Sequence, residues 1–359
     1  GRAGLDVGAV EEAAAAIAAV QFPDGGCAQG GAVSFFFENR GLAASLMHLA
    51  GVLQYAYQQG KAMIVSEKHP WIYTDPVACP SRSFQCYFQA WSSCASAHTP
   101  EGSFQAGGRA HLVRDMNRAV APEMAQKGGG LFATRLAAFA FLWRIRGDVL
   151  SEADIANAKA AIGYERPIIA MHVRRGDSCH TSLRQGRCQG VEENLAAARS
   201  MAERYGIRRV FVATDSPEVM GQLRALAGDL TFISIEEGFN RSALENSILA
   251  CRRKHPEKGD DGTRLEDGCT GNDAWLEHRL GRGEVDAKEL ALATMLDVTL
   301  MSHADAFVGH FASNLSRLAY LLSALFHRRL VPFVSVDGPW CYHWRMCCDI
   351  LPDGSSQPC

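Results

Sequence analysis

Short hydrophobic runs alternate with helical patterns over the second half of the chain. The runs predict buried strands at 167–173, 209–214, 230–235, 306–309 and 330–336. Between them, apolar residues recur at helical spacing over 191–205, 217–227, 287–303 and 313–326. Strands that alternate with helices in this way indicate a doubly wound, Rossmann-like parallel sheet.

The first half of the chain has a less regular pattern. It predicts helices at 9–20, 41–57 and 131–143 and a short buried strand at 62–65. Ser151, three residues before Asp154, is a suitable N-cap for a further helix to residue 161. Residues 70–111 are rich in aromatic residues, serine and cysteine, which indicates a looped region tied by disulfides. For the polar segment 252–284 we expect either a mobile surface insertion, such as a lid, or an inert loop.

Length and pattern together predict an α/β protein with two domains. A chain of 359 residues exceeds what one hydrophobic core usually organises. We expect a helix-rich α/β domain over 1–160, a Rossmann-like domain over 161–340 and a cysteine-rich tail over 341–359.

Composition limits the partners and the compartment. The formal net charge is only -3, so no overall field favours nucleic acid or a membrane surface. Any anionic ligand must therefore be bound by a local group of cations and backbone amides. The 12 cysteines fit an oxidising compartment with several disulfides, although a set of buried free thiols is the alternative. Cys179 and Cys188 are the candidate local pair.

The N-terminal region has no pattern of a signal peptide or a membrane span. Residues 9–20 are apolar but short, and Glu11 and Glu12 interrupt them, as in a surface helix. The start at Gly1 suggests a luminal domain whose membrane anchor lies upstream. Asn240 and Asn314 begin short N-glycosylation sequons.

Charged residues follow the first strand of the predicted sheet, where ligands of such sheets bind. Arg174 and Arg175 come directly after the buried run 167–173, and Asp177 follows them. Two adjacent arginines are costly at the end of a buried strand unless they meet anions, and the guanidinium fork suits phosphate oxygens. The structural alternative is that one of them pairs with Asp177 or another carboxylate.

Two further strand ends carry polar residues. Asp215 either caps the following helix or accepts hydrogen bonds from a ribose or sugar hydroxyl. Small residues around Ser313 lead into a helix, whose first backbone amides and dipole favour a phosphate. Together with the arginine pair, this pattern describes a clamp for a diphosphate. The chain has no P-loop, no GxGxxG and no DxD-type carboxylate pair, so the expected mechanism needs no metal and no cofactor.

These strand ends resemble those of the α1,6-fucosyltransferases, which include the core N-glycan enzyme and its rhizobial Nod-factor relative. The resemblance is carried by 166–177 (RPIIAMHVRRGD), 209–215 (RVFVATD) and 296–320, with weaker similarity at 333–338 and 40–48. It covers about residues 130 to 340 in register. It implies a GT-B fold, GDP-fucose as donor and a glycan or glycoprotein acceptor on the side of the N-terminal domain. With the cysteines, it implies the lumen of the Golgi or endoplasmic reticulum.

The resemblance also implies roles for individual residues. His172 matches a histidine near the guanine nucleotide, Arg174 and Arg175 match the pair on the diphosphate, and Asp177 supports that loop. Asp215 and Asp297 match residues of the nucleotide and sugar pocket. Ser313 and Asn314 match the phosphate-binding turn, and Arg317 matches an arginine one helical turn further on.

The chain departs from this family where the general base is expected. Ser178 and Ser182 occupy the positions of a lysine and of the glutamate that is the family's proposed base. We expect His180 to be the base, with Glu192 or Glu193 as the second choice; His180 could equally be a loop residue without a role.

The predicted reaction is an inverting attack by an acceptor hydroxyl, with the charge of the leaving diphosphate stabilised by the clamp. Three alternatives stay open. The donor could be another GDP- or UDP-linked hexose or pentose. The chain could be a non-catalytic glycan-binding relative, or a disulfide-tied structural protein.

Overall fold

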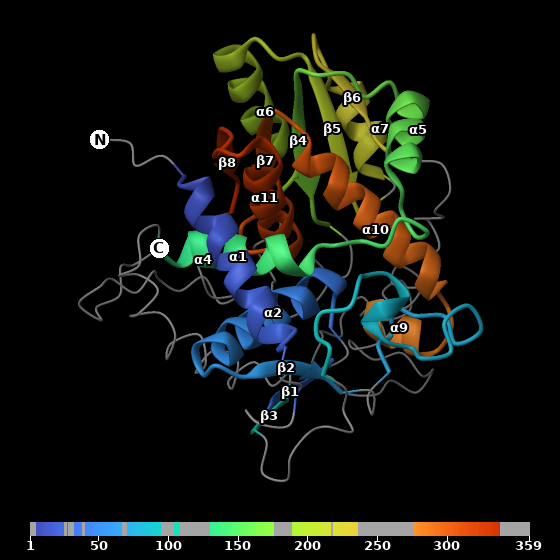
Figure 1. Ribbon diagram of the computed structural model, residues 1–359. Coiled ribbons are helices and arrows are strands. Elements are labelled where there is room, and N and C mark those ends of the chain that lie inside the picture. Colours follow the sequence, from blue (N-terminus) through green and yellow to red (C-terminus); the bar gives the residue numbers. More distant parts are fainter. Residues whose placement is uncertain are drawn as a thin grey trace. The chain divides into compact units, whose positions relative to one another are not determined.

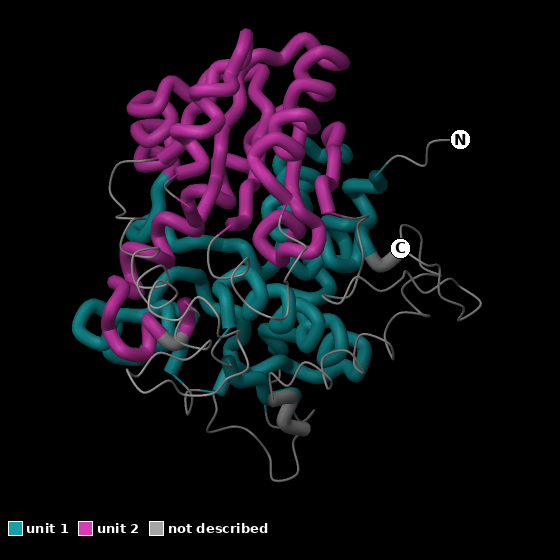
Figure 2. Tube along the Cα trace, turned by 180° about the vertical axis from the view of Figure 1, so that it is seen from behind, with its two compact units in different colours: residues 1–151, 318–330, 339–359 teal, residues 152–317, 331–338 magenta. Residues whose placement is uncertain are grey.

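The computed structural model describes residues 5–24, 27, 32–37, 40–66, 70–94, 104–107, 130–175, 189–216, 218–235 and 276–337. The chain forms two compact units (Figure 2). Unit 1 contains Gly1–Ser151, Leu318–Leu330 and Pro339–Cys359, whereas unit 2 contains Glu152–Arg317 and Val331–Gly338. Helix α11 (Asn314–His327) thus contributes residues to both units. The domain limits expected at 160 and 340 stay predictions.

Unit 2 is built on five parallel strands in the order β6-β5-β4-β7-β8 (Figure 1). They are β4 (Ile168–Val173), β5 (Arg209–Thr214), β6 (Thr231–Ile233), β7 (Ala306–Gly309) and β8 (Phe333–Ser335). Every strand lies within a run that the hydrophobic pattern predicted, so the doubly wound parallel sheet is confirmed. The strand order reverses between β4 and β7, and such a switch point is where open α/β sheets bind ligands.

Helices cover both faces of this sheet. The helices of unit 2 are α5 (Glu152–Ile162), α6 (Val191–Tyr205), α7 (Glu218–Ala225), α9 (Leu276–Gly281) and α10 (Ala287–Ser302). Met171 of β4 packs with Leu195 of α6 and Leu223 of α7 in one buried cluster. On the opposite face, Tyr164 packs against Phe211 of β5 and donates a hydrogen bond of 2.8 Å to a carbonyl of α10. Because strand side chains alternate, the neighbour of Met171, His172, lies on the α10 face.

Helix α9 lies at the end of the segment 252–284, for which we expected a mobile surface insertion or an inert loop. Leu280 and Arg279 of this helix are buried. Arg279 Nε lies 3.4 Å from Glu284 Oε2. The first part of that segment lies outside the described residues.

Unit 1 contains a second, smaller parallel sheet in the order β2-β1-β3. Its strands are β1 (Ala32–Phe36), β2 (Ala62–Val65) and β3 (Phe104–Gly107), and its helices include α1 (Val7–Gln21), α2 (Leu42–Gln58) and α4 (Gly130–Leu142). The hydrophobic pattern predicted these three helices and β2 but neither β1 nor β3. With a parallel sheet in each unit, the α/β, GT-B-like fold is confirmed.

Two disulfides tie unit 1. Cys79 pairs with Cys86, beside the short helix η1 (Phe84–Cys86), and Cys27 pairs with Cys94. Cys94 is also part of a small buried cluster with residues of β1 and β2. These bonds confirm a looped, disulfide-tied region after residue 70. The expected Cys179–Cys188 pair lies outside the described residues.

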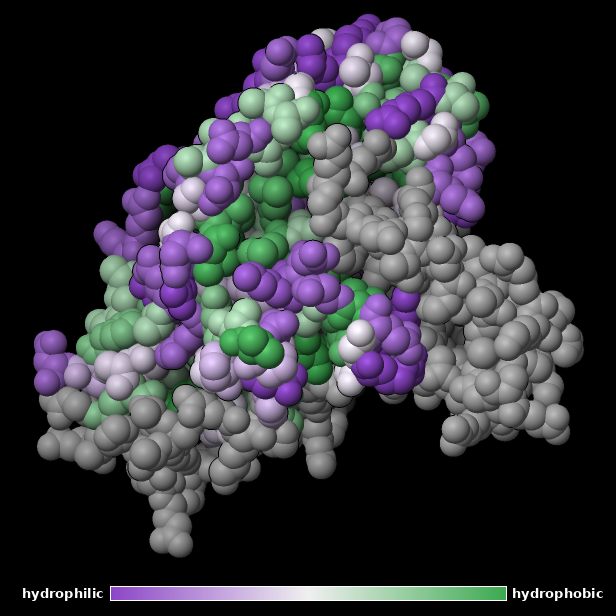
Figure 3. Space-filling view, turned by 90° about the vertical axis from the view of Figure 1, so that its right-hand side faces the viewer, coloured by the Kyte–Doolittle hydropathy of each residue, from purple (hydrophilic) through white to green (hydrophobic). Residues whose placement is uncertain are grey.

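The visible surface mixes hydrophilic and hydrophobic residues (Figure 3). Large hydrophobic side chains that stay exposed in the described part of the chain are Phe22, Val77, Tyr205, Leu226, Phe326, Leu330 and Phe333. They come from separate elements, as is normal for a globular protein. Within the described residues, no helix combines the length and apolar character needed to span a bilayer.

Candidate functional site

Asp215 binds both members of the arginine pair at the ends of β4 and β5. The two strands are parallel neighbours and pair Val173 with Thr214, which places the next residues of each strand side by side. Arg174 Nη1 donates to Asp215 Oδ2 at 2.5 Å, and the backbone N–H of Arg175 donates to Asp215 Oδ1 at 2.8 Å. The expected internal ion pair of one arginine is thus present, with Asp215 as its carboxylate. Neither of the two roles expected for Asp215 anticipated this bond.

The guanidinium group of Arg175 is differently placed. Its Nη1 lies 3.4 Å from Gln222 Oε1 of α7, which is a long hydrogen bond at an exposed position. Among the described residues, that contact is the only one of the Arg175 side chain. Since Asp215 balances the charge of Arg174, the two arginines and Asp215 together leave one net positive charge at this strand end.

The start of α11 supplies backbone donors at the neighbouring strand. The N–H of Ser313 donates to the carbonyl of His310 at 2.8 Å, so that amide is already used. The next three amides, those of Asn314, Leu315 and Ser316, have no acceptor within the described part of the chain. First-turn amides and the positive end of the helix dipole favour an anion at this position.

Asp337 already places a carboxylate beside this turn. Its two oxygens accept the N–H of Ala312 at 3.4 and 3.3 Å, and its Oδ1 accepts the hydroxyl of Ser335 at 3.2 Å. The N–H of Phe311 donates to the same hydroxyl at 3.2 Å. Residues at the end of β8 therefore fix the turn between β7 and α11.

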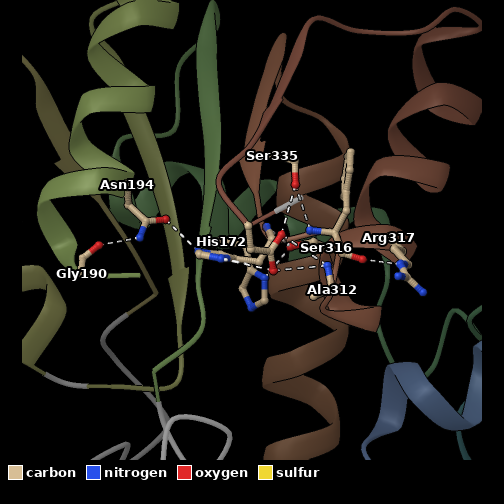
Figure 4. Close-up of polar contacts among 10 residues, drawn as sticks. His172, Gly190, Asn194, Ala312, Ser316, Arg317 and Ser335 are labelled. Atoms are coloured by element: carbon tan, nitrogen blue, oxygen red, sulfur yellow. Dashed lines mark hydrogen bonds and ion pairs between the residues drawn. The ribbon is translucent and has the colours of Figure 1, made fainter. Parts of the chain in front are cut away.

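A buried polar network links β4, β7, α6 and α11 (Figure 4). His172 Nδ1 lies 2.7 Å from the hydroxyl oxygen of Ser316, which also accepts the backbone N–H of His310 at 3.0 Å. His310 Nε2 lies 2.9 Å from Asn194 Oδ1, and the amide nitrogen of Asn194 donates to the carbonyl of Gly190 at 2.8 Å. All four side chains are buried, so each bond costs free energy to break without replacement.

The structure places the other predicted residues as follows. Asp297 is buried in α10. Arg317 is fully buried, and its Nε donates to the carbonyl of Phe311, which supports the turn before α11. Glu192 is exposed in the first turn of α6, with its carboxylate and that of Glu193 beside Gly190. Asp177 and His180 lie outside the described residues.

Sequence reasoning missed the residues that support this site. Asn194, Ser316, Ser335 and Asp337 were not proposed, although Asp337 stands in a segment whose similarity to the fucosyltransferases was noted. For Asn194 and Ser316, the available signal was a small polar residue inside an otherwise apolar helical face. Such residues are buried only when they find hydrogen-bond partners.

No protein-family model matches the chain. Solved structures similar to it include fucosyltransferase NodZ from Bradyrhizobium, with 15% identity over 87% of this chain and 97% of that chain and a TM-score of 0.47. NodZ α1,6-fucosyltransferase soaked with GDP-fucose has 14% identity over 86% of this chain and 95% of that chain, with a TM-score of 0.43. POFUT1 in complex with GDP-fucose has 11% identity over 86% of this chain and 98% of that chain, also with a TM-score of 0.43. Over most of its length, the chain is thus similar to fucosyltransferases of known structure.

Proposed function

We propose that the chain is an inverting, metal-independent glycosyltransferase of the GT-B type, which transfers fucose from GDP-fucose to a hydroxyl group of a glycan or glycoprotein. The observation that carries this proposal is the arrangement at the switch point of the sheet. There, the Arg175 side chain follows β4, while three first-turn amides of α11 follow the adjacent strand β7. Amides at a helix N-terminus and arginine side chains are two kinds of donor that bind phosphate groups in proteins.

The hydrogen-bond donors at this edge favour a leaving diphosphate. As the bond from the anomeric carbon to the phosphate oxygen breaks, negative charge grows on the diphosphate. The proposal assigns the binding of that charge, without a cation, to Arg175 and to the amides of Asn314, Leu315 and Ser316, which follow the adjacent strands β4 and β7. Asp215 binds the side chain of Arg174 and the backbone N–H of Arg175, so the main chain at this strand end is ordered before the substrate arrives.

The nucleoside and the sugar would contact His172, Asp215 and Asp297. His172 and Asp297 are buried on the face of the sheet that α10 covers. The residue that removes the acceptor proton is His180 or, in the described part of the chain, Glu192 at the start of α6. We assign binding of the acceptor glycan or glycoprotein to the N-terminal domain.

The choice of fucose rests on the resemblance of the strand-end segments to the α1,6-fucosyltransferases. A screen of nucleotide sugars decides it: release of GDP from GDP-fucose, and not from other GDP- or UDP-linked sugars, is the expected result. Turnover of only a different nucleotide sugar would replace fucose as the transferred sugar, while the protein would still be a glycosyltransferase. Glycan binding without nucleotide binding would instead favour the non-catalytic relative.

The two disulfides support a location in the lumen of the Golgi or endoplasmic reticulum, where such bonds persist. Immunofluorescence of the full-length protein with luminal markers tests this location.

The direct test of the clamp is GDP binding, measured by thermal shift and calorimetry. GDP should raise the melting temperature of the wild type, because ligands of the native state stabilise it. Loss of charged hydrogen bonds in Arg175→Ala should weaken GDP binding roughly tenfold or more. Arg204→Ala is the matched control, since Arg204 lies in the last turn of α6 over the Tyr205 ring. Equal GDP affinity in Arg175→Ala and Arg204→Ala would contradict the proposal that Arg175 binds the diphosphate.

A further inference from the structure

The contact between His172 and Ser316 is shielded from water on both sides. His172 is 2% exposed and Ser316 is 0% exposed, and the distance from Nδ1 to the hydroxyl oxygen is 2.7 Å. A hydrogen bond of this length connects the strand that leads to the arginine pair with the first turns of α11 (Figure 4). Its direction depends on which of the two groups supplies the proton.

The hydrogen-bond inventory of Ser316 determines that direction. A serine hydroxyl has one proton to donate and two lone pairs that accept. One lone pair accepts the backbone N–H of His310 at 3.0 Å. Within the described part of the chain, the remaining partner of the hydroxyl group is His172 Nδ1. If Nδ1 carried the proton, the buried hydroxyl proton would have no acceptor there, which costs about 1–3 kcal/mol.

The hydroxyl group therefore donates to Nδ1. An imidazole whose Nδ1 accepts a hydrogen bond carries its proton on Nε2 when it is neutral. The geometry thus selects the Nε2–H form of His172 before any ligand binds.

Gly309 makes this contact possible. Met171 pairs with Val308 across β4 and β7, so His172 and Gly309 are neighbours on the same face of the sheet. A Cβ atom at position 309 would lie 2.8 Å from the Ser316 hydroxyl oxygen and 2.5 Å from Cε1 of Phe307. The missing side chain leaves the space in which the Ser316 hydroxyl reaches His172.

We propose that Ser316 is a positioning residue that holds His172 as a neutral imidazole with its proton on Nε2. In this form, His172 offers an N–H donor to an acceptor atom of the bound nucleotide. The proposal deepens the proposed function and rests on it for the identity of that ligand. The assignment of the proton to Nε2 does not rest on the proposed function.

The protonation form can be read directly from the protein without ligand. Long-range proton–nitrogen NMR spectra of histidine-labelled protein distinguish the two neutral forms, and His172→Gln identifies the signal among the 12 histidines. We expect the Nε2–H form in the wild type and a loss of this restriction in Ser316→Ala. The matched control is Ser323→Ala, which removes a fully buried hydroxyl group of the same helix that has no hydrogen-bond partner in the described chain.

Binding supplies the second readout. GDP affinity should fall about fivefold in Ser316→Ala, as expected for loss of one positioned hydrogen bond, and should not change in Ser323→Ala. A wild-type His172 with its proton on Nδ1 would overturn the inference, even if Ser316→Ala failed to fold. Unchanged spectra and affinity in a folded Ser316→Ala would overturn it as well. If the wild type did not bind GDP, the proposed function would fail while the NMR result still decided the role of Ser316.

Discussion

His48 lies in α2 of unit 1, buried near two guanidinium groups. Burial and the charges of Arg40 and Arg135 lower its pKa to about 3. The unfolded chain binds a proton at this histidine below its ordinary pKa of 6.5, while the folded chain does so only near pH 3. The free energy of unfolding therefore decreases as pH falls through this window, by about 1.4 kcal/mol per pH unit from this group alone.

Replacement of His48 by glutamine should remove that dependence. As pH falls from 6.5 to 4, we expect the unfolding free energy of the wild type to decrease more than that of His48→Gln, so that the variant becomes relatively more stable. Urea unfolding at several pH values measures it, and His327→Gln, at the last position of helix α11, is the control. Parallel pH profiles for His48→Gln and the wild type would show that His48 titrates normally in the folded protein.

Asp215 shows how far sequence can predict the site. The arginine pair and Asp215 could both be found, because each follows a recognisable buried strand. That they bind each other depends on the order of the strands, which brings the ends of β4 and β5 together. Strand order is a property of tertiary packing, so the local pattern left two other roles open for Asp215.

The elements themselves differ in how well their sequence determines them. Long segments with a clear period, such as α6 and α10, were predicted within one residue of their ends. β1 was missed because its residues do not alternate clearly, and β3 because its four residues, FQAG, include few strand-forming types. Both strands are short and are defined by pairing with neighbours rather than by their own composition.

The two disulfides of unit 1 should contribute unequally to stability. Cys27 and Cys94 are separated by 67 residues, whereas Cys79 and Cys86 are separated by 7. A longer closed loop removes more entropy from the unfolded chain, which corresponds to about 4 kcal/mol for the first bond and about 2 kcal/mol for the second. The double variant Cys27→Ala/Cys94→Ala should therefore lose more unfolding free energy than Cys79→Ala/Cys86→Ala.

Chemical denaturation without reductant measures both variants against the wild type. Cys94 is also buried in a cluster with Ala32, Ala62 and Ile64, so loss of packing acts in the same direction. A larger loss in the variant of the short loop would mean that residual structure in the unfolded chain, and not loop length, governs the effect.

At the scale of the whole molecule, the described residues of the candidate clamp belong to one of the two units. Arg175, Asp215 and the first turn of α11 all belong to unit 2, although they are far apart in sequence. The parallel sheet explains this, because it brings the carboxyl ends of β4, β5 and β7 to one edge. Unit 1 contributes its own sheet and the two disulfides, and none of the described clamp residues.

This division predicts where a bound nucleotide changes hydrogen exchange. GDP should slow amide exchange at 173–175, at 214–216 and above all at 314–316, because the proposal gives those last three amides a phosphate as acceptor. Exchange in β1 and β2 of unit 1 should stay the same. Mass spectrometry of peptides from both units measures this, with adenosine diphosphate as the control nucleotide. Protection confined to unit 1 would contradict the site, since it would place the nucleotide on the sheet that carries no arginine pair.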